Sequence, residues 1–404
     1  MCRKAIFLLP VVALLVGCGG KKDHNMWQSS VVVAEKTTTN GVALITMDPA
    51  LLKDTIVFPI SHFMGEIEFV KLDDADDALV YPAPVEISDN YILVKTARAS
   101  GGDYRSSVPI PCKLFDKKGK FISNIGAIGQ GPGEYTMIYS MQIDEKGGRI
   151  YLLPWQSDKI LAYDLSGKLM EPIPMPYRAP KGVFKVDGDR VIVAITPFQN
   201  NPSVAWVQDL NGEVIQEFPA GHFQVSDFSN EVFSYQNAGK FDLSFWNYPA
   251  RVDSLYYIDV AKKELVPQFT FKFEKDKTPE SHGYIEWTDY FVGNTSAPVY
   301  ITDGNGRREE GKKPAFFILD KKTLKGSYFK VANDYFAGGE EGWPIDLFNK
   351  GYYVRNVEPA NLLDMIEELL KSDKLNEKMR VKLTELQSTI DENDNNYIYY
   401  AKMK

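Results

Sequence analysis

"KLFDKKGKFISNIG", residues 113–126, has the pattern of two strands joined by a turn. An apolar run ends at Asp116, a polar turn containing a glycine follows, and an alternating apolar run comes after the turn. That pattern is typical of a β-hairpin. The same pattern recurs four more times, with its aspartate at Asp164, Asp209, Asp259 and Asp320. The spacings between these aspartates are 48, 45, 50 and 61 residues, which indicates a repeat.

A second strand pattern precedes the first four hairpins. These runs are apolar or alternating and cover residues 90–96, 148–154, 189–195 and 240–246, and a further run covers 351–357. Strands in groups of about four, repeated about every 45 to 60 residues, fit the blades of a β-propeller. Together with strand-like sequence near both ends, the five hairpins predict six blades. We therefore expect an all-β fold, a six-bladed β-propeller over residues 45–404.

One helical region interrupts the strands near the C-terminus. Leu362, Ile366, Leu369 and Leu370 share one helical face, and the apolar residues between 375 and 390 share another. We expect a helical hairpin insertion over 359–391, packed on the edge of the propeller, and a closing strand over 396–404. Such a strand can close the ring by joining strands from both termini in one blade. A coiled coil that binds a partner is the alternative role for the helices.

The N-terminus has the features of an export signal with a lipid attachment site. Arg3 and Lys4 precede an apolar run at 5–16 that is short for a membrane span and suits a signal peptide. The run leads into "LVGC" at 15–18, a bacterial lipobox. We expect a signal peptide at 1–17, a lipidated Cys18, and a flexible tether over 18–44. The expected location is the cell envelope, with the lipid anchor in the outer membrane.

Charge and residue composition restrict the possible partners. Removal of Arg3 and Lys4 from the 46 basic residues leaves 44 against 54 acidic ones, about −10 in charge, which argues against nucleic acid as a partner. Once Cys2 is removed and Cys18 is lipidated, Cys112 is alone and fits a small buried residue better than a nucleophile. We expect no catalytic residues, no metal and no cofactor, because no His or Cys pair has metal-ligand spacing and no nucleophile elbow is present. The acidic segments 73–77 and 391–396 lack an EF-hand pattern, so we interpret them as solvated turns.

The glycine-rich segment "NIGAIGQGPGEY", residues 124–135, could be a phosphate loop or a corner of the chain. It lacks the Gly-Lys-Ser/Thr of a phosphate loop, Pro132 removes a donor, and no helix pattern follows, so we expect a corner. The stretch "GQGPGEYTMIYSMQIDEKGGRIYLLPWQSDKILAYDLSGKLM" resembles an NHL repeat. The whole layout resembles the six-bladed β-propeller lipoproteins of Gram-negative bacteria. That resemblance implies a propeller fold and an envelope location rather than a particular activity.

Candidate ligand residues lie in the loops between the second and third strands of the expected blades. In a propeller these loops converge on one face around the central channel. They contain aromatic, amide and arginine side chains, which suit the flat faces and polar edges of sugars or peptides. Trp155, Phe198 and Trp246 are separated by 43 and 48 positions, close to the repeat length. The predicted ligand-binding residues are Tyr104, Arg105, Trp155, Phe198, Gln199, Trp246, Tyr248 and Arg251.

Two functional hypotheses remain open from the sequence. The first is a non-catalytic envelope lipoprotein that binds a saccharide, a peptide or a protein partner. The second is a propeller hydrolase or lyase with a metal at the channel mouth. An enzyme needs carboxylates, histidines or amides gathered at the ends of inner strands, whereas a binding protein needs a bowl lined by aromatic rings. Each tryptophan also has a structural alternative, because aromatic rings can pack between neighbouring blades.

Overall fold

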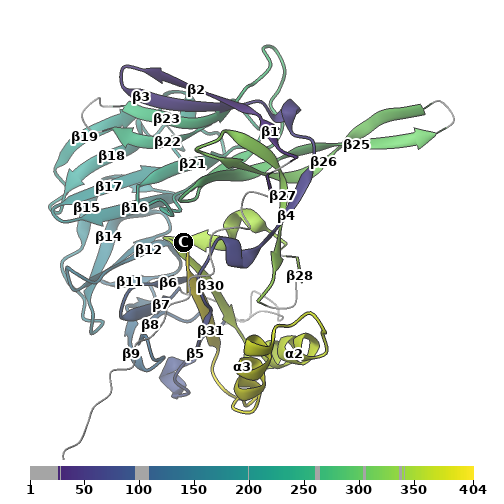
Figure 1. Ribbon diagram of the computed structural model, residues 1–404. Coiled ribbons are helices and arrows are strands. Elements are labelled where there is room, and N and C mark those ends of the chain that lie inside the picture. Colours follow the sequence, from purple (N-terminus) through teal and green to yellow (C-terminus); the bar gives the residue numbers. More distant parts are fainter. Residues whose placement is uncertain are drawn as a thin grey trace, which may run out of the picture.

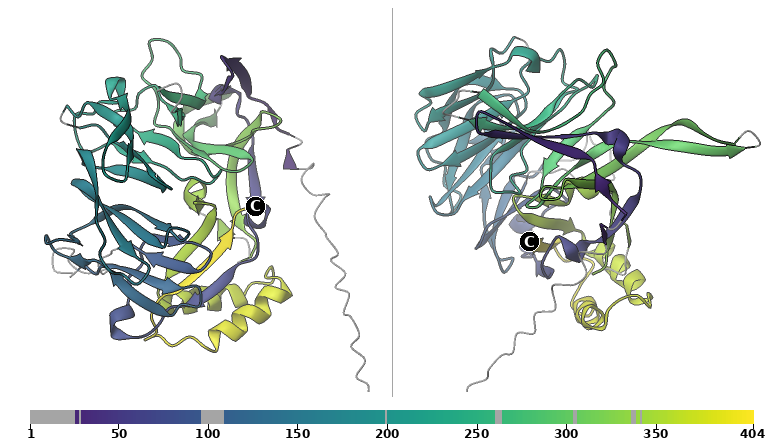
Figure 2. Two further views of the ribbon diagram at one scale, coloured as in Figure 1. Left: turned by 90° about the vertical axis from the view of Figure 1, so that its left-hand side faces the viewer. Right: turned by 45° about the horizontal axis from the view of Figure 1, so that its top comes forward.

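The computed structural model describes residues 26–404, apart from residues 28, 96–108, 199, 260–263, 304–305, 336–338 and 341. Six β-sheets follow one another around a ring, as the views in Figures 1 and 2 show. The fold is mostly β, as expected, and is a six-bladed propeller. Within each blade the strands run from an innermost strand outward, and the inner strands of neighbouring blades contact one another.

The first three blades each use four consecutive strands, joined by hairpins. Blade 1 consists of β6 (Val85–Ile87), β7 (Tyr91–Val94), β8 (Cys112–Asp116) and β9 (Phe121–Ile125). Blade 2 consists of β12 (Ile138–Asp144), β13 (Arg149–Pro154), β14 (Ser157–Asp164) and β15 (Ile173–Ala179). Blade 3 consists of β16 (Gly182–Asp187), β17 (Arg190–Ile195), β18 (Ser203–Asp209) and β19 (Val214–Pro219).

Blades 4 and 5 add strands from the N-terminal part of the chain to their outer edges. Blade 4 is built from β20 (Glu231–Phe233), β21 (Asp242–Trp246), β22 (Ser254–Asp259) and β23 (Glu264–Phe271), and it is extended by β3 (Val42–Met47) and β2 (Ala34–Thr39). Blade 5 is built from β24 (Gly283–Glu286), β25 (Tyr290–Asp303), β26 (Gly306–Asp320) and β27 (Lys325–Asn333), and β1 (Val31–Val32), β4 (Thr55–Pro59) and β28 (Gly339–Glu340) pair with β27.

These additions correct the expected tether over 18–44. The part from Val31 onward is sheet, because β3 pairs in parallel with β23 and β4 pairs in parallel with β27. Trp27 also packs on Phe58, with ring centroids 5.6 Å apart. A second difference concerns blade 5, where we expected a loop of the ligand face between the second and third strands and where residues 303–313 lie. Strands β25 and β26 instead continue through most of this stretch, and Figure 1 shows them as a long hairpin that projects from the ring.

Blade 6 closes the ring with strands from both ends of the described chain. It consists of β29 (Phe348–Asn349), β30 (Tyr352–Val357), β31 (Tyr397–Lys402) and β5 (Glu68–Lys71). Strand β31 lies between β30 and β5, with Tyr399 opposite Phe69. The acidic segments 73–77 and 391–396 meet beside this closure, where Asn395 donates to the backbone carbonyl of Asp73 at 2.8 Å. Most of the acidic residues in these turns are exposed, as expected, while Asn395 and Asn396 are buried at the junction.

The five repeated aspartates end the third strand of blades 1 to 5. In blade 1, the Oδ1 atom of Asp116 accepts from the backbone N–H groups of Lys118 and Lys120, at 2.8 and 3.0 Å. Asp164, Asp209 and Asp320 accept in the same way from their own turns. An aspartate thus recurs because its carboxylate satisfies the donors of the turn that leads to the outer strand.

The glycine-rich segment is a corner, as expected. Its backbone binds the carboxylate of Glu134, a residue of the same segment. The N–H of Gly131 donates to Oε2 of Glu134 at 2.8 Å. Short strands β10 (Ala127–Ile128) and β11 (Glu134–Tyr135) pair in parallel across the corner. Gly133 has φ +73°, a conformation that glycine adopts without strain. The hydroxyl of Tyr135 accepts from the N–H of Cys112 at 2.8 Å, which fixes the corner to the buried core of blade 1.

Two helices form the expected insertion before the closing strand. Helix α2 (Pro359–Leu370) buries Leu362 and Ile366, and α3 (Glu377–Gln387) buries Met379 and Leu383 against the core between blades 5 and 6. Asn376 caps α3 by accepting from the N–H of Met379 at 2.8 Å. The remaining helical elements are short 3₁₀ turns at Pro49–Leu51, Ile60–His62, Asp76–Ala78, Gly221–Phe223 and Pro344–Leu347. Within the described residues, no helix is both long and apolar enough to cross a membrane.

The turn between β29 and β30 enters the centre of the ring. The Nζ atom of Lys350 donates to Glu86 at 2.7 Å and to the carbonyl of Met141 at 3.0 Å. The backbone N–H of Lys350 donates to the carbonyl of Tyr235 at 2.7 Å. Lys350 of blade 6 therefore contacts blades 1, 2 and 4, and it ties together strands that lie on different sides of the central axis.

Candidate functional site

The described candidate residues lie on loops that follow the second strand of their blades. Trp155 is in the turn between β13 and β14, Phe198 follows β17, and Trp246 ends β21, with Tyr248 and Arg251 in the loop after it. Because second strands all end on the same side of a propeller, these residues lie on one face of the ring. Tyr104, Arg105 and Gln199 lie outside the described residues.

Phe228 joins two of the predicted aromatic residues into a cluster. Its ring lies 4.4 Å from Phe198 and 6.5 Å from Trp155, measured between centroids. Phe228 belongs to the connection between blades 3 and 4. Its ring nevertheless contacts the loops of blades 2 and 3, through Trp155 and Phe198. Trp155 and Phe228 remain 40% and 42% exposed. Their rings are therefore available to a ligand as well as to each other.

Trp246 and Tyr248 form a second aromatic pair on the same face. Their rings are stacked, with centroids 6.4 Å apart and an interplanar angle of 19°. They are 37% and 65% exposed. The N–H of Tyr248 donates to Oδ1 of Asn230 at 3.1 Å, which places this pair beside the segment that carries Phe228. We call Trp155, Phe198, Phe228, Trp246 and Tyr248 the aromatic face.

Arg251 has a different role from the one expected. Its guanidinium donates to the backbone carbonyls of His222, Phe223 and Gln224, at 2.8, 3.2 and 3.1 Å. These bonds hold the 3₁₀ turn at Gly221–Phe223 against the loop after β21. The Arg251 side chain thus fixes the position of the loop that carries Tyr248, and its guanidinium is bound to backbone carbonyls.

A polar cluster lies at the channel mouth next to the aromatic face. Tyr139 of blade 2 donates its hydroxyl hydrogen to Oε2 of Glu231 in blade 4, across the channel. Lys181, just before β16, makes an ion pair with Oε1 of Glu231 and donates to the carbonyl of Asn230 at 3.1 Å. Lys95, just after β7, donates to the carbonyl of Tyr139 at 2.9 Å. We call Lys95, Tyr139, Lys181 and Glu231 the mouth cluster.

The mouth cluster and the aromatic face are directly adjacent. Glu231 lies opposite Trp246 in the β20–β21 pairing, so the two side chains are on the same side of that sheet. Lys181 also donates to the carbonyl of Phe228. A ligand that stacks on these rings would therefore meet the carboxylate and the ammonium at its edge.

Burial tunes the ionisable groups of the mouth cluster. It raises the pKa of Glu231 to about 7. Burial also lowers the pKa of Lys181 and of Lys95. The cluster thus combines a carboxyl that titrates near neutral pH with two ammonium groups and a phenol. Within the described part of the chain, no three His, Cys, Asp or Glu side chains are grouped to hold a metal ion.

Sequence reasoning missed Phe228 and the mouth cluster. Tyr139, Lys181 and Glu231 stand 42 and 50 positions apart, close to the repeat length, and each lies at the start of an inner strand. That spacing indicates equivalent positions in successive blades, and it is visible in the sequence. Phe228 carried no such signal, because it lies in a connection between blades that has no counterpart in the repeat.

Comparisons with known proteins bear on the family and on the fold. A family model described as a domain of unknown function, DUF4934, matches residues 44–402. A crystal structure of a "putative exported protein" from Bacteroides fragilis is 18% identical, with a TM-score of 0.51, and the match covers 87% of this chain and 98% of that one. A member of the DUF4221 family from Bacteroides vulgatus is 10% identical, with a TM-score of 0.41, covering 84% of this chain and 97% of that one. No curated protein matches the chain.

Proposed function

Because the chain belongs to the DUF4934 family, whose description names no activity, we propose a function from the chain's own surface. The protein is a non-catalytic binding module of the cell envelope, and it holds a saccharide on the aromatic face. Its lipobox at 15–18 would attach it to the outer membrane through Cys18. The match to a protein described as exported agrees with that location.

The observation that carries the proposal is the pairing of exposed rings with the mouth cluster. Trp155 and Phe228 on one side, and Trp246 and Tyr248 on the other, offer two apolar platforms. Sugar rings stack on such platforms through their C–H faces, while their hydroxyl groups need donors and acceptors at the edge. The Glu231 carboxylate supplies acceptor lone pairs at that edge, and Lys181 holds the carboxylate in place. A peptide could use the same platforms and is tested alongside.

The experiment is a binding screen of the purified full-length protein against oligosaccharide and peptide arrays, followed by calorimetry. Loss of one stacking ring costs about 0.5–1.5 kcal/mol, so Trp155→Ala and Trp246→Ala should each weaken saccharide affinity by up to about tenfold. Trp343→Ala is the matched control, because Trp343 is exposed but packs on Phe316 of blade 5. Equal affinity of wild type and both variants, or selective binding of peptides, would refute the saccharide assignment.

The enzyme hypothesis keeps one supporting observation. Glu231, with a pKa near 7 and a phenol and an ammonium in contact, resembles a general acid–base group. A hydrolase or lyase would cleave the saccharide that binds, and Glu231→Gln would abolish cleavage while retaining binding. Product analysis after prolonged incubation with each bound saccharide separates the two functions. Intact ligand indicates a binding protein, and turnover that depends on Glu231 indicates an enzyme.

A further inference from the structure

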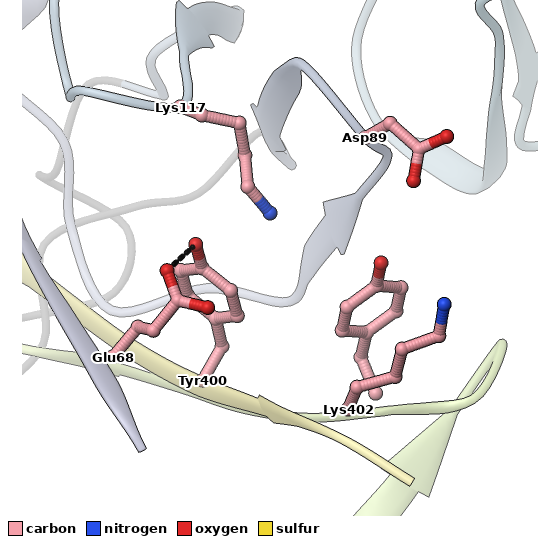
Figure 3. Close-up of a pocket in the computed structure, with 6 residues that line it drawn as sticks. Glu68, Asp89, Lys117, Tyr400 and Lys402 are labelled. Carbon is pink, nitrogen blue, oxygen red and sulfur yellow. Dashed lines mark hydrogen bonds between the residues drawn. The ribbon is translucent and has the colours of Figure 1, made fainter. Parts of the chain in front are cut away.

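A second concave site lies between blades 6 and 1, on the side of the ring opposite the aromatic face. It is an open pocket of about 400 Å³, lined by Glu68, Asp89, Lys117, Tyr352, Tyr400 and Lys402. Figure 3 shows these side chains converging from β5, β30, β31 and two turns of blade 1. The hydroxyl of Tyr400 donates to Glu68 at 2.7 Å. The volume is within the range of small-molecule sites.

Lys117 is the central group of this pocket. Its Nζ atom lies 4.0 Å from the ring centroid of Tyr400 and 5.5 Å from that of Tyr352. The side chain is partly buried, and among the described residues no oxygen lies within hydrogen-bond or ion-pair distance of this ammonium, although the carboxylates of Glu68, Asp89 and Glu145 attract it from farther away. Ring faces attract a cation but accept its hydrogens only weakly. Three strong donors are thus left for an external acceptor.

A structurally equivalent lysine in blade 5 shows what Lys117 lacks. Lys321 follows the turn aspartate Asp320, just as Lys117 follows Asp116. The backbone N–H of Lys321 donates to the backbone carbonyl of Asp289, and that of Lys117 donates to the backbone carbonyl of Asn90. The Nζ atom of Lys321 has three partners: Glu286 at 2.6 Å, Trp287 O at 2.6 Å and Thr288 O at 3.0 Å.

The difference between the two blades lies in one position of the inner strand. Glu286 stands opposite Phe291 at the end of β24, and in blade 1 the corresponding residue is Ile87, opposite Ile92. Blade 1 therefore has the lysine of this arrangement, Lys117, but has Ile87 where blade 5 has the carboxylate that accepts from the lysine. The buried apolar side chain of Ile87 fills that position, and Lys117 lines the pocket instead.

The other groups of the pocket indicate which chemical groups a ligand of this site must carry. Lys402 and the Tyr352 hydroxyl add two donors that have no partner among the described residues. Glu68 and Asp89 add carboxylate acceptors, which lie on opposite sides of Lys117 in Figure 3. A matching ligand has an anionic oxygen group for the lysines and the phenol, and hydrogen-bond donors for the two carboxylates. The two tyrosine rings provide flat walls for its carbon skeleton.

We propose that this pocket binds a small carboxylate that also carries hydrogen-bond donors, with Lys117 as the anchor of the carboxylate group. The ligand carboxylate would accept from Lys117 as Glu286 accepts from Lys321. Its hydroxyl or ammonium donors bond to Asp89 and Glu68. A sugar acid and an amino acid share this chemistry, and both can be tested directly. The pocket is separate from the aromatic face. The proposed binding of a carboxylate in the pocket therefore does not depend on the proposed binding of a saccharide on the aromatic face.

The test is calorimetric titration of the purified full-length protein with D-galacturonate, L-serine and D-galactose. Galacturonate and serine both carry the carboxylate, with hydroxyl or ammonium donors respectively, and galactose has the donors without the carboxylate. We expect one of the two carboxylates to bind at least tenfold more tightly than galactose, and the one that binds identifies the source. If neither galacturonate nor serine binds more tightly than galactose, or if none of the three gives any heat, the proposal is overturned.

Variants of neighbouring lysines assign the effect to the anchor. Lys117→Met should weaken binding of the carboxylate at least tenfold, and Tyr352→Phe should weaken it less. Lys118→Met is the matched control, since it removes the same charge from an exposed neighbour and should leave affinity unchanged. Thermal unfolding of each variant checks that the fold is intact. If Lys117→Met is folded and binds as wild type does, the assignment of the anchor is wrong.

Discussion

The hydroxyl of Tyr163 donates a hydrogen bond of 2.7 Å to the carbonyl of Gly133, 30 residues earlier in the chain. Tyr163 belongs to the third strand of blade 2, and Gly133 belongs to the corner that leads into that blade. The bond is buried, together with those of Tyr135 to the backbone of blade 1. The corner is therefore held from both of the blades that it connects.

Gly133→Val should destabilise the fold through this corner. The residue has φ +73°, and a Cβ atom there would lie 2.8 Å from the side chain of Leu169. We expect the free energy of unfolding to fall by about 1–3 kcal/mol, the usual cost of such strain. Chemical denaturation measures it. Gly131→Ala is the control: Gly131 is outside the left-handed region, and its new Cβ would meet only the movable end of Glu134.

Asp242 should make the protein less stable as the pH rises. Its carboxyl is buried, its Oδ2 atom has no hydrogen-bond partner in the described structure, and burial raises its pKa from 3.8 to about 6. Between those values the folded chain holds a proton that the unfolded chain has released. Stability from this group is therefore present below pH 3.8 and is lost as the pH rises through about 6, by about 3 kcal/mol.

Asp242→Asn removes that loss. Unfolding free energies measured from pH 4 to 8 should fall less steeply for the variant than for wild type. The exposed Asp158→Asn serves as the control and should follow the wild-type profile. Parallel profiles for wild type and Asp242→Asn would show that the buried carboxyl is not the titrating group.

Lys350→Met should weaken the centre of the propeller. The substitution leaves Glu86 buried without its ion-pair partner and removes the bond to Met141 O. Loss of one member of a buried pair costs about 3–5 kcal/mol, and because the Lys350 side chain is only partly buried the expected loss is about 3 kcal/mol. Lys146→Met, at an exposed lysine in the β12–β13 turn, is the control. Similar denaturation midpoints for the two variants would contradict a central role for Lys350.

Cys18→Ala should release the protein from membranes. We propose that the lipobox directs lipid to this residue, and a protein held by lipid alone becomes soluble without it. Fractionation of cells expressing wild type and variant measures the effect. Membrane association of the variant at the wild-type level would show that something other than Cys18 anchors the chain.

The repeat was readable because each of its parts has a local physical cause. The turn aspartates satisfy backbone donors a few residues away, so their pattern is visible in the sequence wherever the hairpin occurs. Strands β7, β13, β17, β21 and β30 lie within the apolar runs that predicted them. Blade number and strand order followed from counting these local units.

The parts that could not be read are those that depend on distant partners. Strands β3 and β4 join blades 4 and 5 by pairing in parallel with β23 and β27, more than two hundred residues away, and no local signal specifies that pairing. The aromatic loops were found because they share the period of the repeat. Phe228 was missed because it lies between two repeats and gains its place only through contacts with Trp155 and Phe198.

The closure of blade 6 has a consequence for the order of events during folding. The bond between Tyr400 and Glu68 joins residues 332 positions apart, and the strand that carries Tyr400 is the last of the described chain. The ring cannot close before residues 397–402 have been synthesised, and closing so long a loop slows folding. The described blades therefore become a closed ring only when residues 397–402 insert beside residues 68–71.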